Sequence, residues 1–381
     1  MRRLLAYCCF ISFGVQGVQE FSSSDNSFGV QGVQESSSSD NTPPMEKLMS
    51  ELLVTPELPV TPQEPPELPV TPRESPDRPV FVHDPVMAFE NGTYYLFSTG
   101  RKIQMMTSTD RKSWTFHPQG AMDTIPAWTQ AVVPGFRDHV WAPDIIYWHD
   151  KWWMMYSCST FGKNTSAIGL MTTPSLANPK WEDRGCVVKS NAEDHYNTID
   201  PNIVIDDKDQ PWLTFGSFWD GIQLVRLDTS MHVARGAKPK TIARRYGRKM
   251  PALENPTSKY AGVNAIEAPF IFKHDGWYYL FASWDYCCRG EKSNYRVVVG
   301  RSKKVSGPYR DRDGNDMRKG GGTLILEGDK QQFEAAGHCA AYHLDGKDIF
   351  ICHAYSIPLH GQAMLLQREI RWTQDGWPEL Y

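Results

Sequence analysis

The chain has 381 residues, with 40 Lys and Arg against 44 Asp and Glu, and its formal net charge is −4. This balance excludes a protein that binds nucleic acid through a large excess of basic residues. A hydrophobic content of 40% and an aromatic content of 12% allow a sizeable core, which excludes a chain that is disordered throughout.

The N-terminus has the pattern of a secretory signal peptide. Two arginines, Arg2 and Arg3, precede a short apolar run that ends near Phe13. The run is too short to cross a bilayer, which takes about 20 residues. We therefore predict a signal peptide over residues 1–20, an extracellular protein and no membrane partner. The alternative is an N-terminus that is merely apolar.

A segment of low complexity follows. Ser12–Asn26 recurs almost unchanged as Ser27–Asn41, and residues 42–79 hold 11 of the 27 prolines. Serine tracts bury little apolar area, and dense proline removes backbone hydrogen-bond donors. We predict a disordered linker over residues 21–79. All 13 tryptophans come later, so residues 80–381 are predicted to form the folded domain.

One sequence pattern recurs along the folded domain. A proline near an acidic residue begins an apolar run, a polar turn follows, and an aromatic run ends in serine. The prolines stand at positions 85, 143, 201 and 269, and a weaker fifth repeat without proline begins near residue 338. The expected turns are Asn91-Gly92, Asp150-Lys151, Asp207-Lys208, Asp275-Gly276 and Asp345-Gly346. Five hairpin units predict an all-β fold, a five-bladed β-propeller, with a β-sandwich as the alternative.

Each repeat places a titratable residue at or beside its first position. These residues are Asp84, Asp144, Asp200, Glu267 and His338. A single acid before proline is ordinarily a turn residue. Five at matched positions are expected to converge at one end of the propeller axis, where neighbouring carboxylates shift one another's pKa values apart. One acid can then act as a base and another as a proton donor, which is what cleavage of a glycosidic bond requires.

Several motifs together resemble those of a known family. They are VHDP (residues 82–85), WAPDI (141–145), NTIDPN (197–202), AIEAPF (265–270) and WYYLFASWDYCCRG (277–290). From about Val80 to the C-terminus the chain is similar to the endo-1,5-α-L-arabinanases of glycoside hydrolase family 43. The resemblance implies a five-bladed propeller that cleaves the arabinan side chains of pectin with inversion of configuration.

The same resemblance implies roles for individual residues. Asp84 corresponds to the general base, Glu267 to the general acid, and Asp200 to the carboxylate that raises the pKa of the acid and orients it. His338 corresponds to the position of a calcium or similar ion on the propeller axis, otherwise held by water, and no organic cofactor is implied. Residues of the substrate cleft would be Trp141, Asp144, Phe161 and Trp219.

Two alternatives remain open at this stage. An exo-acting α-L-arabinofuranosidase or a β-xylosidase would use the same three carboxylates, and a carbohydrate-binding propeller would use none of them for catalysis. We expect a monomer. For Cys287 and Cys288 we expect separate partners or free thiols, because a disulfide between adjacent residues closes a strained eight-membered ring.

Overall fold

The computed structural model describes residues 79–247 and 264–381. The predicted signal peptide and nearly all of the predicted linker lie outside these residues. None of the helices in the described part of the chain has the length and apolar character needed to cross a bilayer.

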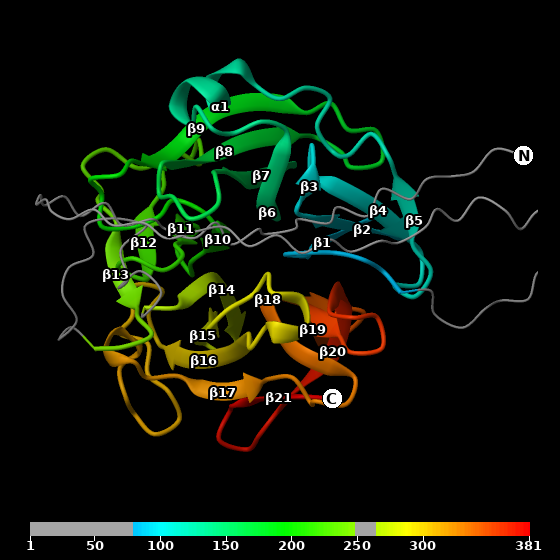
Figure 1. The fold of residues 1–381 in the computed structure, drawn as a ribbon. Coiled ribbons are helices and arrows are strands. Elements are labelled where there is room, and N and C mark those ends of the chain that lie inside the picture. Colours follow the sequence, from blue (N-terminus) through cyan, green and yellow to red (C-terminus); the bar gives the residue numbers. More distant parts are fainter. Residues whose placement is uncertain (1–78, 248–263) are drawn as a thin grey trace, which may run out of the picture. The chain divides into compact units, whose positions relative to one another are not determined.

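Five antiparallel sheets are arranged around a common axis, in chain order (Figure 1). The first comprises β1 (Val86–Glu90), β2 (Thr93–Ser98), β4 (Gln104–Ser108) and β5 (Thr115–His117). The second comprises β3 (Gly100–Arg101), β6 (His139–Trp148), β7 (Lys151–Cys158), β8 (Ser166–Thr173) and β9 (Glu182–Ser190). The third comprises β10 (Asn202–Ile205), β11 (Pro211–Phe215), β12 (Ile222–Arg226) and β13 (Lys240–Ala243).

The last two sheets complete the ring. The fourth comprises β14 (Ile266–His274), β15 (Trp277–Trp284), β16 (Arg296–Ser302) and β17 (Thr323–Leu326). The fifth comprises β18 (Phe333–Leu344), β19 (Lys347–Ser356), β20 (Gln362–Trp372) and β21 (Pro378–Leu380). The predicted five-bladed β-propeller is therefore confirmed. Within residues 79–247 and 264–381, three short helices lie between strands, namely α1 (Ala127–Val132), η1 (Gly290–Lys292) and η2 (Met317–Lys319).

The hairpin turns fall where the repeat predicted them, with one exception. Asn91-Gly92, Asp207-Lys208, Asp275-Gly276 and Asp345-Gly346 form turns between consecutive strands. The prediction of Asp150-Lys151 was wrong by one residue, because Trp148 pairs with Lys151 and the turn is His149-Asp150. Both turn residues have a positive φ, 49° and 60°, as a tight two-residue hairpin requires.

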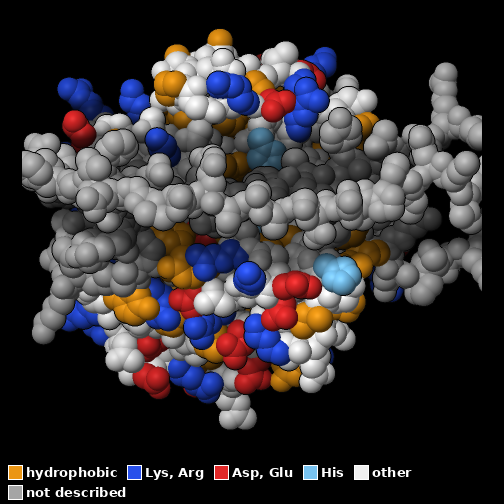
Figure 2. All heavy atoms as spheres, viewed as in Figure 1, with side chains coloured by type: hydrophobic (Ala, Val, Ile, Leu, Met, Phe, Trp, Pro, Cys, Tyr) orange, Lys and Arg blue, Asp and Glu red, His pale blue; other side chains and the backbone are white. Residues whose placement is uncertain are grey.

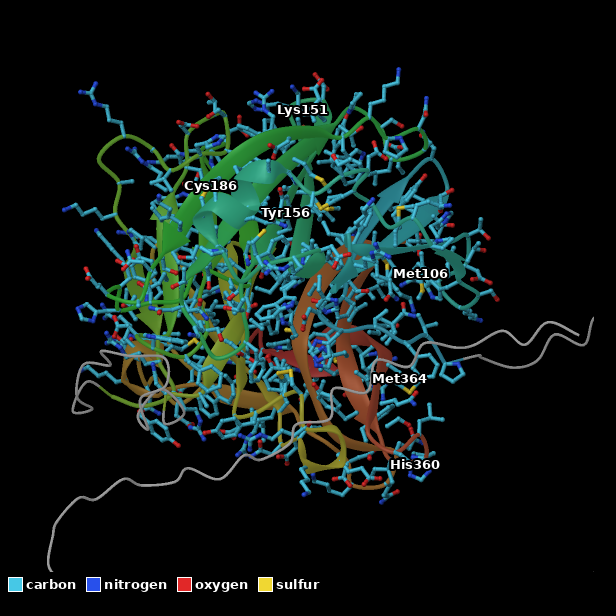
Figure 3. The ribbon with its side chains drawn as sticks, turned by 45° about the horizontal axis from the view of Figure 1, so that its top comes forward. Met106, Lys151, Tyr156, Cys186, His360 and Met364 are labelled. Carbon is cyan, nitrogen blue, oxygen red and sulfur yellow. A yellow bond between two sulfur atoms is a disulfide. The ribbon has the colours of Figure 1, made fainter. Side chains whose placement is uncertain are left out.

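The ring closes by pairing the two ends of the folded domain. Phe81 forms an antiparallel bridge with Met364 of β20, and the backbone N–H of Leu365 donates a 2.8 Å hydrogen bond to the carbonyl of Val80. Figure 3 labels Met106 in the first blade and Met364 in the last. The N-terminal segment therefore serves as an additional edge strand of the last blade.

Aromatic side chains pack within the blades and between them. Trp148 and Trp152 are each only 7% exposed. Within the second blade Tyr156 is fully buried and packs against Gly169, where an added Cβ would lie 2.4 Å from its ring (Figure 3). On the surface, basic and acidic side chains lie intermixed in the described region below the grey trace in Figure 2.

The cysteines correct one prediction. Cys287 and Cys288 are joined in a disulfide, so the expectation of separate partners or free thiols was wrong. The chain has left β15 at this point, and Cys288 adopts a positive φ of 62°, a backbone conformation that an extended strand does not offer. The remaining cysteines of the described residues, Cys158, Cys186, Cys339 and Cys352, are free thiols.

Candidate active site

One left-handed residue marks the start of each blade. These residues are Asp84 (φ 56°), Ala142 (40°), Asp200 (58°), Ala268 (52°) and His338 (52°). The first four directly precede the repeated proline. Asp84, Asp200 and His338 thus occupy equivalent positions, as predicted. Asp144 and Glu267 do not, because alanines take the equivalent position in the second and fourth blades.

Each of these five residues is hydrogen-bonded to the preceding blade through its backbone N–H. The acceptors are His353 Nδ1 for Asp84 (3.0 Å), Thr99 Oγ1 for Ala142 (2.8 Å), Ser157 Oγ for Asp200 (3.0 Å), Asp200 Oδ2 for Ala268 (3.1 Å) and Ser283 Oγ for His338 (2.8 Å). A positive φ costs a non-glycine residue about 1–2 kcal/mol. These bonds offset that cost and fix the backbone from which the site projects.

Asp84 is buried and surrounded by hydrogen-bond donors. Its Oδ1 lies 2.8 Å from His83 Nδ1 and 2.9 Å from His338 Nδ1, and its Oδ2 accepts a 2.5 Å bond from Thr99 Oγ1. Burial by itself would raise the pKa of Asp84. The charges of His338 and His83, and the hydrogen bonds that these side chains make to the carboxylate, instead hold the pKa of Asp84 well below its usual range. Asp84 is therefore an ionised carboxylate at neutral pH.

Glu267 and Asp200 are two further buried acids of the site. Burial raises the pKa of Glu267. The 2.7 Å hydrogen bond that Ser217 Oγ donates to Glu267 Oε2 acts in the opposite direction. Burial also raises the pKa of Asp200, and the negative charge of Glu267 acts in the same direction. Two buried carboxylates that repel one another cannot both ionise easily, so the pair retains a proton near neutrality.

His338 lies between these acids. Its side chain is 13% exposed. Burial would lower the pKa of His338, but Asp84 above all, and then Asp200 and Glu267, raise it to about 9. The structure thus brings together Asp84, Asp200, Glu267 and His338, and the charge of His338 also acts on Asp144.

Asp144, the fifth, has a different environment. It is buried, and its Oδ2 accepts hydrogen bonds from the backbone N–H of Ile203 (2.6 Å) and from Asn202 Nδ2 (3.2 Å). Burial raises the pKa of Asp144 to about 7. These contacts join the second blade to the third. They also engage Oδ2 of Asp144 in hydrogen bonds within the protein.

The three aromatic residues assigned to the cleft differ in exposure. Trp141 on β6 is half-buried, Phe161 is 68% exposed, and Trp219 is 5% exposed. Trp219 follows Phe218, and both have a positive φ. The carbonyl of Trp219 accepts a 2.6 Å bond from Asn264 Nδ2, which ties this turn to the segment that leads into β14.

Several residues of the site were not predicted as members of it. His353 is fully buried and stacks on His83 with ring centroids 3.9 Å apart, while Tyr355 lies 2.9 Å from His83 Nε2. Ser217 contacts Glu267 directly. The recurrent serine at the end of each aromatic run was a visible signal for Ser217. No comparable signal marks His353 or Tyr355.

The ion expected at His338 can be compared with the residues present. Asp84 engages Nδ1 of the ring, which leaves Nε2 as the nitrogen available to a ligand. A carboxylate on one ring nitrogen commonly orients the other toward a metal. The residues therefore fit an ion held by one imidazole nitrogen and by water, provided that the ion displaces the proton of His338.

Comparison with known proteins identifies the class. The family model of glycosyl hydrolases family 43 matches residues 74–378, and the chain belongs to this family. A similar solved structure is an exo-1,5-α-L-arabinanase from a bovine ruminal metagenomic library, with 51% identity, a TM-score of 0.73, and coverage of 79% of this chain and 97% of that one.

Two curated relatives carry different activities in their names. An extracellular exo-α-(1→5)-L-arabinofuranosidase of Cellvibrio japonicus is 43% identical over 79% of this chain and 86% of its own length. An extracellular endo-α-(1→5)-L-arabinanase of Bacillus subtilis is 37% identical over 78% of this chain and 87% of its own length. The predicted family is therefore confirmed.

Proposed function

We propose that this protein hydrolyses the α-1,5-linked L-arabinofuranosyl bonds of arabinan with inversion of configuration. The observation that carries the proposal is the opposite pKa shift of two buried acids in one site, Asp84 downward and Glu267 upward. Such a pair supplies a base and an acid at the same pH. The substrate class is supported by the three similar proteins described above, whose names specify a 1,5-linked α-L-arabinosyl substrate.

The hydrogen bonds support a division of roles. Asp84, ionised by its three donors, would deprotonate the attacking water. Glu267 would hold a proton on one oxygen while Ser217 donates to the other, and would pass that proton to the leaving sugar oxygen. Asp200 accepts a bond from the N–H of Ala268, next to Glu267, but burial and the charge of Glu267 still raise the pKa of Asp200 to about 8. Asp200 would thus share a proton with Glu267 and hold it beside the proposed acid.

The site of the proposed ion is His338, with water completing the coordination. A bound cation would supply positive charge beside the carboxylates. His338 itself, held by Asp84 through Nδ1, would orient both its ligand and the base. No organic cofactor is part of the proposal.

Endo action is the first candidate, on the resemblance of the motifs, and exo action is the second. Exo action is favoured by the higher identity of the two exo-acting relatives, 51% and 43% against 37%.

Digestion of debranched arabinan, with products separated by anion-exchange chromatography over time, tests the proposal. An early ladder of oligosaccharides indicates endo action and arabinose alone indicates exo action. Absence of any release by the folded protein would refute the hydrolase.

We also propose that the protein is secreted and acts as a monomer. Secretion is supported by the apolar N-terminal pattern and by the two relatives that are named extracellular. Sedimentation of the purified folded domain tests the oligomeric state, and N-terminal sequencing of exported protein tests the signal peptide.

A further inference from the structure

The disulfide of Cys287 and Cys288 lies next to the residue that precedes the proposed base. Cys288 Sγ is 3.7 Å from His83 Nε2, and one ring nitrogen of His83 lies within 4.8 Å of both sulfur atoms. The histidine side chain is 28% exposed and Cys288 is exposed, so solvent and small reagents reach this cluster. An imidazole and two sulfurs at such distances form a potential ligand set.

We propose that reduction of this disulfide creates a binding site for a thiophilic metal ion of the Zn²⁺ and Cd²⁺ class. A phosphine reductant and one water molecule convert the disulfide to two thiols, and the phosphine becomes its oxide. The metal then displaces the two thiol protons and binds Cys287 Sγ, Cys288 Sγ and His83 Nε2. Thiolate and imidazole are the ligands that such ions prefer, and water can take the fourth position.

Oxidation closes the same site. In the disulfide both sulfurs are bonded to one another, and neither can become a thiolate, the form of cysteine that binds metal. Of the three residues of this site, His83 is then the one ligand left. Metal affinity should therefore depend on the redox state of Cys287 and Cys288, whereas the proposed ion at His338 has no sulfur ligand.

Hydrogen bonds connect this site to Asp84. The N–H of Cys288 donates a 2.7 Å bond to the hydroxyl oxygen of Tyr355, so the hydroxyl proton is available to His83 Nε2, 2.9 Å away. The other ring nitrogen, Nδ1, lies 2.8 Å from Asp84 Oδ1, so the ring links Tyr355 to the proposed base. A metal on Nε2 would displace the Tyr355 hydroxyl from His83 and place a positive charge one imidazole ring away from the carboxylate of Asp84.

Metal binding is tested without reference to activity. The folded protein, with and without prior treatment with tris(carboxyethyl)phosphine, is titrated with Cd²⁺, and the ultraviolet absorption of the cadmium–thiolate bond is followed. We expect one additional equivalent to bind in the reduced protein. The double variant C287S/C288S should lose that equivalent. His83→Gln should weaken its binding at least tenfold, whereas His360→Gln, an exposed control, should not change it.

Equal binding by oxidised and reduced protein, or unchanged affinity in His83→Gln, would overturn the site. The consequence for catalysis rests on the proposed function, and it is measured separately. We expect Cd²⁺ to slow arabinan hydrolysis at least tenfold in reduced enzyme only, with recovery in excess dithiothreitol, a dithiol that captures Cd²⁺. Binding without inhibition would overturn the link to Asp84, whereas no hydrolysis in any sample would contradict the proposed function and leave the binding result standing.

Discussion

Ser217 Oγ donates a 2.7 Å hydrogen bond to Oε2 of Glu267, across the boundary between the third and fourth blades. Both residues are buried, so this bond acts in a medium where charge is poorly solvated. It stabilises the ionised form of Glu267 and thereby limits how far burial raises the pKa of this acid. Ser217 thus lowers the pH above which Glu267 loses the proton that it must donate.

Replacement of Ser217 by alanine should shift the alkaline limb of the pH profile upward. The pKa of Glu267 is raised, and the activity proposed for it needs the protonated form, so activity falls as pH rises through that pKa. A hydrogen bond to a charged group contributes about 1.5 kcal/mol, and one pKa unit corresponds to about 1.4 kcal/mol. We expect the alkaline midpoint of kcat/KM to move up by about one unit.

A matched variant tests the reason for that shift. Ser283 stands at the equivalent position of the next blade and pairs across the strands with Glu267, but its Oγ accepts a bond from the backbone N–H of His338 and, among the described residues, makes no hydrogen bond to a carboxylate. Ser283→Ala should leave the alkaline midpoint near its wild-type value. An unchanged midpoint in Ser217→Ala, or the same shift in both variants, would contradict the proposed control of Glu267.

Neutral analogues of the two acids should abolish most of the activity. Glu267→Gln cannot donate a carboxyl proton and Asp84→Asn cannot accept one, so each should reduce kcat by about 10²–10⁴-fold. Both amides have nearly the shape of the acids, and circular dichroism should show the wild-type fold. Glu193→Gln, at an exposed position, is the control. Activity within tenfold of wild type in either site variant would refute the assigned role.

The fold and the main acids could be predicted because both belong to the repeat. Proline, turn and serine recur at similar spacing, and each proline has an acid within two residues of it. The repeat did not reveal that Ala142 and Ala268 hold the left-handed position in two of the blades. The residue types at these positions do not indicate a positive φ. Asp144 and Glu267 were therefore placed as equivalents of Asp84, although the backbone aligns Ala142 and Ala268 with Asp84 instead.

The surroundings of Asp84 could not be predicted for another reason. His353 and Tyr355 approach through closure of the ring and lie 269 and 271 positions along the chain from Asp84. No local pattern indicates such a contact, because it depends on how the last blade packs against the first. The disulfide of Cys287 and Cys288 was missed because the sequence does not show the loop conformation that accommodates its eight-membered ring.

The proposed ion makes a distinct prediction for His338. His338→Ala should remove the only imidazole ligand of the proposal, and the dialysed variant should contain less than a tenth of the calcium bound by wild type, as measured by atomic emission. Because an ion that binds only the folded state stabilises it, added calcium should raise the Tm of wild type but not of the variant. His360→Ala, at an exposed position, should behave as wild type. A folded His338→Ala protein that keeps both its calcium and its Tm would remove the ion from the site.

Inversion of configuration is open to direct observation. If Asp84 activates a water on the face opposite the bond that Glu267 protonates, each cleavage gives a β-configured hemiacetal from an α-linked substrate, and the two carboxyl groups should stand about 6.5–9.5 Å apart. Proton NMR of a fast digestion should therefore show the β anomer of the new reducing end first and the α anomer only later, at the separately measured rate of mutarotation. Initial release of the α anomer would instead require a covalent intermediate on one of the acids, and it would reassign Asp84 from base to nucleophile.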